Sequence, residues 1–559
     1  MSSRPDTWPD ATGELLPNTL FKIAEQYPDL VYAEYFTDPI DIAKGHRKVT
    51  YRDFANAVHT TAWWIEENVG NPMIKDGSET IVYLGPNDLT YGILVMASIV
   101  VGYKMLFPSP RYGAEAIAKL IEHVDGNIML STTNPFPVHA KILTRRTMRT
   151  YVLPSLPSLY ATKSPHHPFT KTYAEQKHEH FVCLHTSGTT GFPKPILWTH
   201  EFVNANFQGY YLPPTNDGRE LTHPFTGTSN RIMVPFPAFH TSGIVIQCFV
   251  GLATGSTILL PPPADSPGGV VDMIADTLDY LGSGPDAITT LTLPPPHMEY
   301  LARHPALLSR ISARVARVGF GGGDISALAG NTIAAKLQIL NEFGSTENGL
   351  WPAVTKPQNA LWHYASLHPA LNFRLDPVSE SPDGTVCEAV LVKNPGAFAQ
   401  PLFTMYPHET ERKVGDLFIR HPEYPQLWRH YGRADDLLNF STSETFHPAA
   451  AERRIAGHEC VEEVLMVGTM RPVGALIVRL AQGKGVDDLW SVVEEVNQTS
   501  PVYARVRRDM ILVVAEPFPT TAKGTVQKKA TVDKYKKELD GLYEKVGVVD
   551  VRIDIPMTP

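Results

Sequence analysis

Short apolar runs recur along the chain, and the segments between them have helical periodicity. One such segment is RDFANAVHTTAWWIEE (52–67). Runs of this length, rich in β-branched residues and alternating with helices, are typical of parallel strands whose two faces are both covered. We therefore predict an α/β fold with helix-covered, mostly parallel sheets. The runs are TIVYLG (80–85), NIMLS (127–131), HFVCLHT (180–186), RIMVPFP (231–237), STILLPPP (256–263), AITTLTLPPP (287–296) and ARVGFGG (316–322).

The chain has 559 residues, which is too long for one ordinary core. The charged segment WRHYGRADDLLNF (428–440) precedes a stretch that reads as a small α+β unit. We predict a large N-terminal part over 1–434 and a small C-terminal domain over 435–559, long enough for a core of its own.

The overall charge and the apolar segments exclude several classes of partner. A formal net charge of -9 provides no basic field for a nucleic-acid backbone. The start of the chain lacks the layout of a signal peptide. Gly102 and Lys104 interrupt the apolar stretch at 92–107 before it reaches membrane-spanning length, so we expect a buried helix that leads into a strand. Four widely spaced cysteines without a CxxC pair indicate neither a disulfide framework nor structural zinc, and we expect a cytoplasmic protein with no membrane partner.

A glycine-rich segment, HTSGTTGFPKP (185–195), directly follows one of the predicted strands. Its glycines permit turns that direct successive N–H groups inward, and its hydroxyls add donors for phosphate oxygens. The lysine does not directly follow the last glycine, as it does in a P-loop, so the segment is a damaged P-loop, a plain surface turn or a phosphate loop of another kind. We predict a phosphate-binding loop of another kind, with a polar strand-to-helix turn as the alternative. The candidate residues are Thr186, Ser187, Gly188, Thr189, Thr190, Gly191 and Lys194.

Two further segments have the residue types of a nucleotide site. In LNEFGSTENG (340–349), Phe343 can present a flat face to a base, and Glu347 beside a hydroxyl suits a Mg²⁺ ion shared with phosphates. The alternative is a solvated glutamate. In VGDLFIRH (414–421), Asp416 at the start of a strand can bind a ribose diol, and Arg433 of YGRADD can pair with a phosphate or with that Asp. The alternative is a surface salt bridge.

Together these segments form one ordered series, TSGTTGFPK, NEFGSTE, GD and YGRADD, across the chain. The series resembles that of the adenylate-forming superfamily of acyl-CoA and aryl-CoA ligases, luciferases and peptide-synthetase adenylation domains. The resemblance extends from about Thr50 to TAKGTVQKKA at 521–530. It implies an enzyme, a ligase that converts a carboxylate and ATP to an acyl-adenylate and pyrophosphate, with Mg²⁺.

The resemblance also implies roles for individual residues. The candidate catalytic residues are Lys523, Thr346, Glu347 and His240, with Glu347 near Mg²⁺ and His240 of VPFPAFHTSG at the wall between acid and adenylate. Asp435 matches the hinge about which the C-terminal domain rotates between two half-reactions. Apart from the loop, the residues implied to bind the nucleotide are Asn341, Glu342, Phe343, Gly344, Ser345, Asp416, Tyr431 and Arg433.

The chain departs from the superfamily pattern in its C-terminal part. Thr525 follows Gly524 where the mobile lysine usually stands, and we assign that role to Lys523, with Lys528 and Lys529 as alternatives. The segment LLNFSTSETFHP lacks the glycine pair usual where a pantetheine arm enters. Adenylation is therefore better supported than thioester formation.

The substrate class follows from charge. Pro237 stands where domains that activate amino acids have an aspartate, and an unpaired buried ammonium would cost about 3 to 5 kcal/mol, so we expect a non-amino acid. GFGGGD (319–324) lacks the last glycine and the trailing acidic residue of a dinucleotide-binding motif, so we do not interpret it as a Rossmann-type site. The predicted pocket would admit a flat ring or a short alkyl chain. Its residues are Phe239, His240, Gly243, Gly321, Gly322, Gly349 and Trp351.

HTSGTTGFPKPI, VPFPAFH and AKGTVQKKAT are most similar to the adenylation domain of fungal peptide-synthetase-like carboxylic acid reductases. The resemblance implies transfer of an aryl acid to a phosphopantetheinylated carrier domain, followed by reduction to an aldehyde. The chain ends at IDIPMTP without a carrier serine or an NADPH fold, so we expect an excised module or a free-standing ligase. The open alternatives are a stand-alone acyl-CoA or aryl-CoA ligase that uses CoA, and a nucleotide-binding regulatory module without catalysis.

Overall fold

The computed structural model of the chain describes residues 8–38, 40–72, 79–187, 193–222, 231–264, 266–284, 287–381, 384–396, 398–441, 444–520 and 525–545. These residues belong to two compact units. Unit 1 comprises Met1–Gly323, Ile333–Asn372 and Val392–Glu411, and unit 2 comprises Asp324–Thr332, Phe373–Leu391 and Arg412–Pro559. The boundary between 434 and 435 that the sequence predicts stays a prediction.

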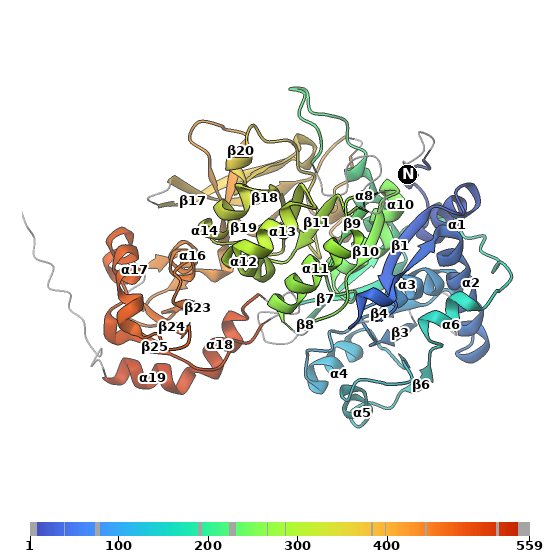
Figure 1. Cartoon of the computed structure of the whole chain (residues 1–559), viewed down its shortest axis with the longest axis horizontal. Helices are drawn as coiled ribbons and strands as arrows, with labels where there is room; N and C mark the ends of the chain where they lie inside the picture. The colour runs from blue at the N-terminus through green and yellow to red at the C-terminus, as the bar shows by residue number, and fades with distance from the viewer. Residues whose placement is uncertain are drawn as a thin grey trace, which may run out of the picture. The chain divides into compact units, whose positions relative to one another are not determined.

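Unit 1 contains a seven-stranded sheet in the order β13-β12-β11-β9-β10-β1-β2. Neighbouring strands are parallel except for the antiparallel pair of β1 and β2 (Figure 1). The sheet therefore matches the mostly parallel arrangement that the apolar runs predict. Its strands are β1 (Val31–Phe36), β2 (His46–Thr50), β9 (Arg231–Met233), β10 (Thr257–Leu260), β11 (Thr290–Leu293), β12 (Arg317–Gly321) and β13 (Gln338–Glu342).

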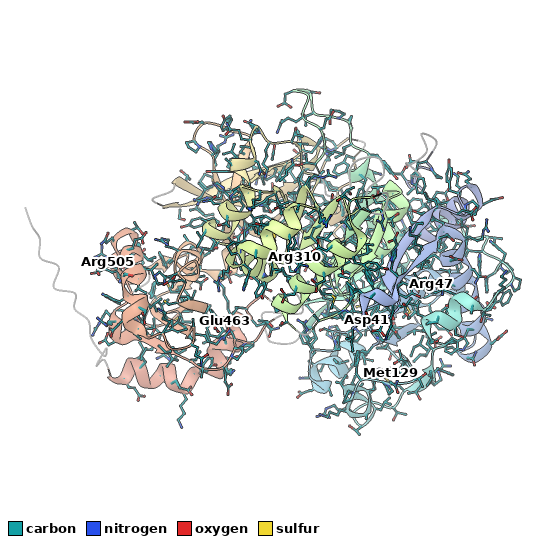
Figure 2. All side chains as sticks on the ribbon, viewed as in Figure 1. Asp41, Arg47, Met129, Arg310, Glu463 and Arg505 are labelled. Carbon is teal, nitrogen blue, oxygen red and sulfur yellow. The ribbon has the colours of Figure 1, made fainter. Side chains whose placement is uncertain are left out.

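A six-stranded sheet in the order β6-β5-β3-β4-β7-β8 is the second sheet of unit 1. It is parallel apart from the antiparallel pair of β7 and β8. Met129, which Figure 2 labels, is 1% exposed and belongs to the apolar cluster between this sheet and α4 (Ala114–His123). The strands are β3 (Thr80–Tyr83), β4 (Lys104–Leu106), β5 (Ile128–Ser131), β6 (Arg149–Val152), β7 (His180–Ser187) and β8 (Pro193–Thr199).

The helices of unit 1 begin and end where the local sequence allows. Thr50 and Asp53 form a capping box at the start of α2 (Tyr51–Asn68), and Gly102 in the left-handed conformation ends α3 (Thr90–Val101). Helix α3 is buried nearly all round and contacts α2, β4 and β7. This confirms the predicted buried helix that leads into a strand. In the described part of the chain, no helix combines the length and the apolar character that crossing a membrane requires.

Charged side chains connect the outer helices of unit 1. Arg310 of α13 (Pro305–Ser312), labelled in Figure 2, pairs with Asp276 and Asp279 of α11 (Pro267–Leu281).

The remaining helices and short strands of this unit include α1 (Leu16–Gln26), α5 (Val138–Leu143), α6 (Leu156–Ala161), α7 (Tyr173–Gln176), α8 (His200–Tyr210), α9 (Thr241–Val245), the π-helix η2 (Ile246–Val250), α10 (Gly251–Thr254), α12 (Pro295–Arg303), β14 (Gly344–Ser345), β15 (Gly349–Leu350) and α15 (Pro401–Met405). Helix α14 (Ala327–Ala334) includes residues of both units.

Unit 2 combines antiparallel strands with an α+β part. β17 (Phe373–Ser381), β18 (Gly384–Val392), β19 (Glu411–Arg420) and β20 (Leu427–Arg433) are consecutive neighbours in one sheet. A second sheet has the order β23-β24-β25, and its strands share an apolar cluster with the helices of the C-terminal part. These elements are β23 (Val461–Val467), β24 (Ala475–Leu480), β25 (Ile511–Val513), α16 (Ala449–Ala456), α17 (Val486–Thr499), α18 (Lys528–Lys534) and α19 (Lys536–Lys545), with β21 (Leu438–Asn439) and β22 (Thr445–Phe446) before them.

Candidate active site

The predicted phosphate loop joins two antiparallel strands. Its first residues end β7, and β8 begins directly after it, with Thr186 opposite the exposed Lys194 and Ser187 opposite Pro193. The turn is followed by a strand of the same sheet and not by a helix as the alternative has it, and phosphate binding by this segment stays a prediction. Gly188, Thr189, Thr190 and Gly191 lie outside the described residues.

Thr346 connects three motifs that are far apart in the sequence. Its backbone oxygen accepts a hydrogen bond from Trp198 Nε1 of β8 at 2.8 Å, and its hydroxyl lies 2.7 Å from the Thr241 hydroxyl at the start of α9. Thr346 is only 5% exposed, so both contacts form where water cannot compete freely. The strand after the glycine-rich loop, the start of α9 and the NEFGSTE segment thus meet at one residue.

The turn after Thr346 is fixed by close backbone contacts. Gly349 has φ +68°, and a Cβ there would lie 2.2 Å from Asn206 Oδ1, which accepts a hydrogen bond from the Leu350 N–H at 3.2 Å. Trp351 is 4% exposed, and its ring stacks on that of Phe343 at a centroid distance of 6.4 Å. Two residues that the sequence assigns to the acid pocket, Gly349 and Trp351, thus also have a structural role in this turn.

The start of α9 is equally compact. His240 is the N-cap, and its Nδ1 accepts from the Ser242 N–H at 3.1 Å. Gly243 is needed for close packing, since a Cβ would lie 2.2 Å from the Pro237 oxygen. Phe239 is 7% exposed.

Glu342 at the end of β13 is partly exposed, but its carboxyl oxygen Oε1 is buried. Burial raises the pKa of Glu342 to about 8, and its Oε1 has no hydrogen-bond partner among the described residues. Gly321 of β12 lies opposite, where a Cβ would lie 2.7 Å from the backbone carbonyl oxygen of Glu342. Gly322 follows with φ +83°. The raised pKa favours the neutral form of Glu342 near pH 7, and Gly321 and Gly322, which the sequence assigns to the pocket, lie beside its backbone.

The residues around Thr346 fit a magnesium ion that is shared with phosphates. Glu347 is partly exposed and directly follows the buried Thr346. The described ranges hold no group of three or more His, Cys, Asp or Glu side chains that could bind a metal. Magnesium needs only one or two protein carboxylates when phosphates and water complete its octahedron, and the single carboxylate of Glu347 meets that requirement.

The predicted ribose residues lie together in unit 2. Asp416 lies inside β19, which corrects the prediction that it stands at the start of a strand: the strand extends from Glu411, although its pairing with β20 begins only at Asp416, opposite Arg433. Asp416 Oδ1 is 3.3 Å from Arg433 Nη1, and Arg433 Nε is 3.2 Å from Asp435 Oδ1. Tyr431, at 8% exposure, packs in the apolar cluster of this sheet with Leu417.

The structure distinguishes between the candidate lysines of the C-terminal segment. Lys523 lies outside the described residues. Lys528 Nζ is 3.2 Å from Asp436 Oδ2 and 3.3 Å from Glu452 Oε2. Burial alone would lower the pKa of Lys528, but Glu452 and Asp436 raise it above its ordinary value. Lys529 is exposed. Lys528 is thus held by two carboxylates, whereas the assignment of the mobile lysine to Lys523, with Lys529 as the alternative, stays a prediction.

Sequence reasoning did not identify two charged residues in unit 2. His430 lies between the carboxylates of Asp324 and Asp416. Both were visible in the sequence, His430 inside WRHYGRADD and Asp324 at the end of GFGGGD. The available signal was a lone histidine two residues before the glycine of YGRADD, which does not reveal that Asp324 lies beside it.

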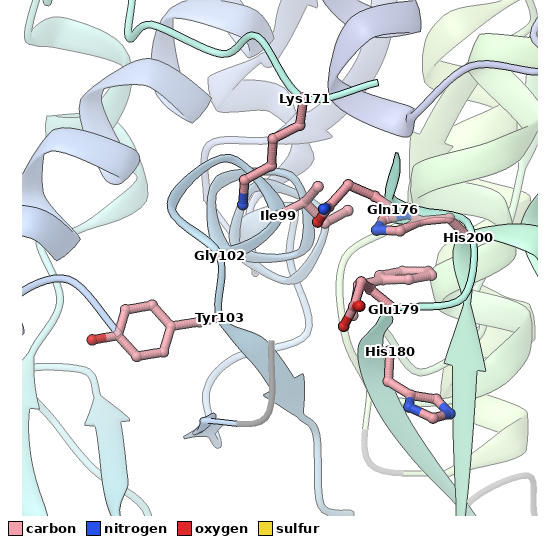
Figure 3. Close-up of a pocket in the computed structure, with 9 residues that line it drawn as sticks. Ile99, Gly102, Tyr103, Lys171, Gln176, Glu179, His180 and His200 are labelled. Carbon is pink, nitrogen blue, oxygen red and sulfur yellow. The ribbon is translucent and has the colours of Figure 1, made fainter. Parts of the chain in front are cut away.

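A small cavity of about 30 Å³ lies elsewhere in unit 1, beside the end of α3 and the start of β7 (Figure 3). Figure 3 shows Lys171 with its amino group directed toward Gly102, while Glu179 and His180 lie on the other wall. None of the predicted pocket residues lines it. The volume suits one or two water molecules rather than a carboxylic acid, whose pockets are about ten times larger.

Comparison with known families identifies the chain. A model of the AMP-binding enzyme family matches residues 20–372, and the model of the AMP-binding enzyme C-terminal domain matches residues 435–547. The chain belongs to the AMP-binding enzyme family. This confirms the adenylate-forming superfamily, and with it an enzyme of the adenylate-forming ligase class, as the sequence motifs predict.

This AMP-binding enzyme is similar to curated fungal proteins over most of its length. It is 28% identical over 543 residues to the isocyanide synthase-NRPS hybrid crmA of Aspergillus fumigatus, covering 95% of this chain and 33% of that protein. It is 28% identical over 529 residues to a carboxylic acid reductase of Neurospora crassa, covering 91% of this chain and 48% of the relative. The chain thus spans half or less of the length of these relatives.

Solved structures confirm the fold of this AMP-binding enzyme. The O-succinylbenzoate coenzyme A synthetase MenE of Bacillus subtilis, in complex with AMP, superimposes with a TM-score of 0.68 at 16% identity. The superposition covers 92% of this chain and 98% of MenE. At this identity the likeness establishes the architecture alone, mostly parallel α/β sheets followed by a small C-terminal domain.

Proposed function

We propose that this AMP-binding enzyme activates a carboxylic acid without an α-ammonium group, most suitably an aryl acid, as its acyl-adenylate. A carboxylate oxygen of the acid attacks the α-phosphorus of ATP, the bond to the β-phosphate oxygen breaks, and pyrophosphate leaves. The observation that carries the proposal is the meeting at Thr346 of the strand after the glycine-rich loop, the start of α9 and the NEFGSTE segment.

Each unit supplies a different part of this chemistry. In unit 1 we assign the triphosphate to the loop at 186–194, the adenine and α-phosphate to the 341–346 segment, and the acid to the pocket beside His240. When bound, Mg²⁺ near Glu347 would neutralise charge on the phosphates. In unit 2 we assign the ribose to Asp416 and Arg433, and a mobile positive charge to Lys523.

Two features support a substrate without an ammonium group. Pro237 offers no carboxylate at the position where amino acids would be held, and burial raises the pKa of Glu342 to about 8, which favours its neutral form near pH 7. A neutral carboxyl group can donate a hydrogen bond but provides little attraction for an ammonium group.

We further propose that the adenylate passes to the thiol of a phosphopantetheinylated carrier domain, with release of AMP, and that other domains reduce the thioester to an aldehyde. The Neurospora crassa relative is named a carboxylic acid reductase, and this chain covers 48% of it, which leaves room for further domains in such a protein. Free CoA is the alternative acceptor, since MenE, whose fold is similar, is a coenzyme A synthetase.

The test is ATP–pyrophosphate exchange over a panel of benzoic, cinnamic, aliphatic and α-amino acids. We expect exchange that depends on the acid, is strongest with aryl acids and is lowest with amino acids. Trapping the adenylate with hydroxylamine gives an independent readout. A CoA thioester that accumulates when CoA is added would favour a stand-alone ligase, and nucleotide binding without exchange for any acid would favour a regulatory module.

A further inference from the structure

A bend in the sheet of unit 2 brings His430 to the same face as Asp416. Asp416 lies opposite Arg433 in the pairing of β19 with β20, but the register shifts after Leu417, so that Phe418 lies opposite His430 rather than Tyr431. Successive side chains of a strand alternate between faces, and a bulge reverses this alternation beyond it. His430 therefore shares its face with Asp416 instead of pointing to the other side.

Both ring nitrogens of His430 face carboxylate oxygens. Nδ1 is 2.9 Å from Asp324 Oδ2, and Nε2 is 3.4 Å from Asp416 Oδ1. An ionised carboxylate can only accept hydrogen bonds, so both nitrogens must donate and the ring is an imidazolium. Burial alone would lower the pKa of His430, but the two carboxylates raise it to about 10. Burial alone would raise the pKa of Asp324, but His430 and Arg453 lower it to about 2.

The ions around His430 form a chain that ends at one oxygen of Asp416. Arg453 Nη1 of α16 lies 2.6 Å from Asp324 Oδ2, which also accepts from His430. Arg433 reaches the same Oδ1 of Asp416 as His430 does. Asp416 Oδ2 makes no hydrogen bond within the described ranges, and the side chain of Asp416 is 22% exposed. One carboxylate oxygen is thus fixed by two cations while the other remains available to a ligand.

We propose that His430 is a positioning residue for the nucleotide, which fixes Asp416 through Oδ1 so that Oδ2 is directed at the ribose diol. This inference rests on the proposed function, in which Asp416 binds the ribose. A network that served stability alone would have no reason to leave one oxygen of Asp416 open while both cations contact the other. Holding a carboxylate in one orientation before the ligand arrives removes part of the entropy cost of binding.

The test compares two nucleotides that differ only in the diol. The dissociation constants of ATP and 2′,3′-dideoxy-ATP are measured by calorimetry for the wild type, His430→Asn and Asp416→Asn. His458→Asn is the matched control, because His458 is a partly buried histidine of unit 2 whose Nδ1 contacts Cys460 and not Asp416. We expect the wild type and H458N to prefer ATP by tenfold or more, as hydrogen bonds to a carboxylate allow. In H430N and D416N the preference should fall to within about threefold.

A purely structural role for His430 would weaken the binding of both nucleotides equally and leave their ratio unchanged, which would overturn the proposal. If H430N does not fold, His430→Gln is used instead, because its single amide group also cannot bridge both carboxylates. An unchanged ratio of the two dissociation constants in H430Q would likewise overturn the proposal. A wild type that binds both nucleotides equally also overturns it. Failure of the proposed function would give a different result. The chain would then prefer ATP to 2′,3′-dideoxy-ATP but would catalyse no acid-dependent exchange. In that case the role of His430 in nucleotide binding would stand, and only the adenylation reaction would be ruled out.

Discussion

At the scale of single residues, our proposal gives the hydroxyl of Thr346 a role that differs from that of the Thr241 hydroxyl. Thr241 contacts Thr346 and nothing of the substrate in our proposal, whereas Thr346 also belongs to the segment assigned to the α-phosphate. Replacing Thr346 by Val keeps the β-branched shape and removes the hydroxyl. We expect Thr346→Val to lower the exchange rate about 100-fold, within the range for a lost transition-state donor. The matched variant Thr241→Val should cost less than tenfold in the same assay, and equal losses would contradict a direct role for Thr346.

Glu342 gives a prediction for the dependence of stability on pH. Its pKa rises from 4.5 to about 8 on folding, so the folded chain binds this proton more tightly than the unfolded chain. The stabilisation is complete below pH 4.5 and is lost as the pH rises toward 8, by at most about 1.4 kcal/mol per pH unit. Glu342→Gln stays neutral and should remove this slope. Urea unfolding between pH 5 and 8 measures it, and a constant difference between E342Q and the parent at all pH values would contradict the prediction.

The residues of the candidate site were predictable where a motif combines residue types that one ligand requires. Thr346 and Asp416 belong to this class, because a hydroxyl beside an acid and an acid after a glycine indicate phosphate and ribose chemistry. His430 and Asp324 were not predictable in this way. They are 106 residues apart in the sequence, and only the pairing of β19 with β20 and its bulge bring the histidine to the face of Asp416.

At the scale of elements, the turn between β14 and β15 depends on one glycine. Gly349 and Gly282 have nearly the same φ, +68° and +69°, but a Cβ on Gly349 would lie 2.2 Å from Asn206 Oδ1, whereas nothing lies within 4 Å of one on Gly282. We expect Gly282→Ala to lower the free energy of unfolding by about 1 to 3 kcal/mol through backbone strain, because its φ of 69° with a ψ of -155° is a conformation that glycine alone adopts readily. Gly349→Ala should cost about 1 to 3 kcal/mol more, because Asn206 must move as well.

Urea denaturation of both variants measures this difference. If G349A and G282A lose the same stability, the contact with Asn206 contributes nothing. The double variant with Asn206→Ala separates the two terms, since removing the obstructing amide should make the double variant more stable than the sum of the single losses predicts.

The strands were the most predictable elements. All seven apolar runs contain a strand of the structure, because a buried strand needs a continuous apolar stretch that local sequence shows directly. The order of strands and the start of β19 were less accessible. Pairing partners determine both, and the sequence around Gly415 reads as a turn although Gly415 and Asp416 lie inside β19.

At the scale of the whole molecule, the compact units of the structure and the two matching family models divide the chain at different residues. The family models leave residues 373–434 between them, while the structure groups Phe373–Leu391 and Arg412–Pro559 into one compact unit. Charge in the sequence marked the segment before 435 but could not show that β17 to β20 belong to the same unit as the C-terminal strands and helices, since that depends on contacts between distant strands.

The division of labour between two half-reactions gives the last prediction. We expect Lys523→Ala to slow adenylation about 100-fold while leaving ATP binding nearly unchanged, because the lysine acts on the developing charge of the transition state. Thiolation of a preformed acyl-adenylate should be retained if Lys523 serves only the first half-reaction. Lys528→Ala is the matched variant: removing its ion pairs with Asp436 and Glu452 leaves two carboxylates without their partner, so it should lower the thermal stability of the C-terminal part more than the adenylation rate. Single-turnover adenylation, calorimetric ATP binding and thermal unfolding measure these effects for both variants. If K523A adenylates as fast as the parent while K528A or Lys529→Ala does not, the catalytic role moves to that lysine.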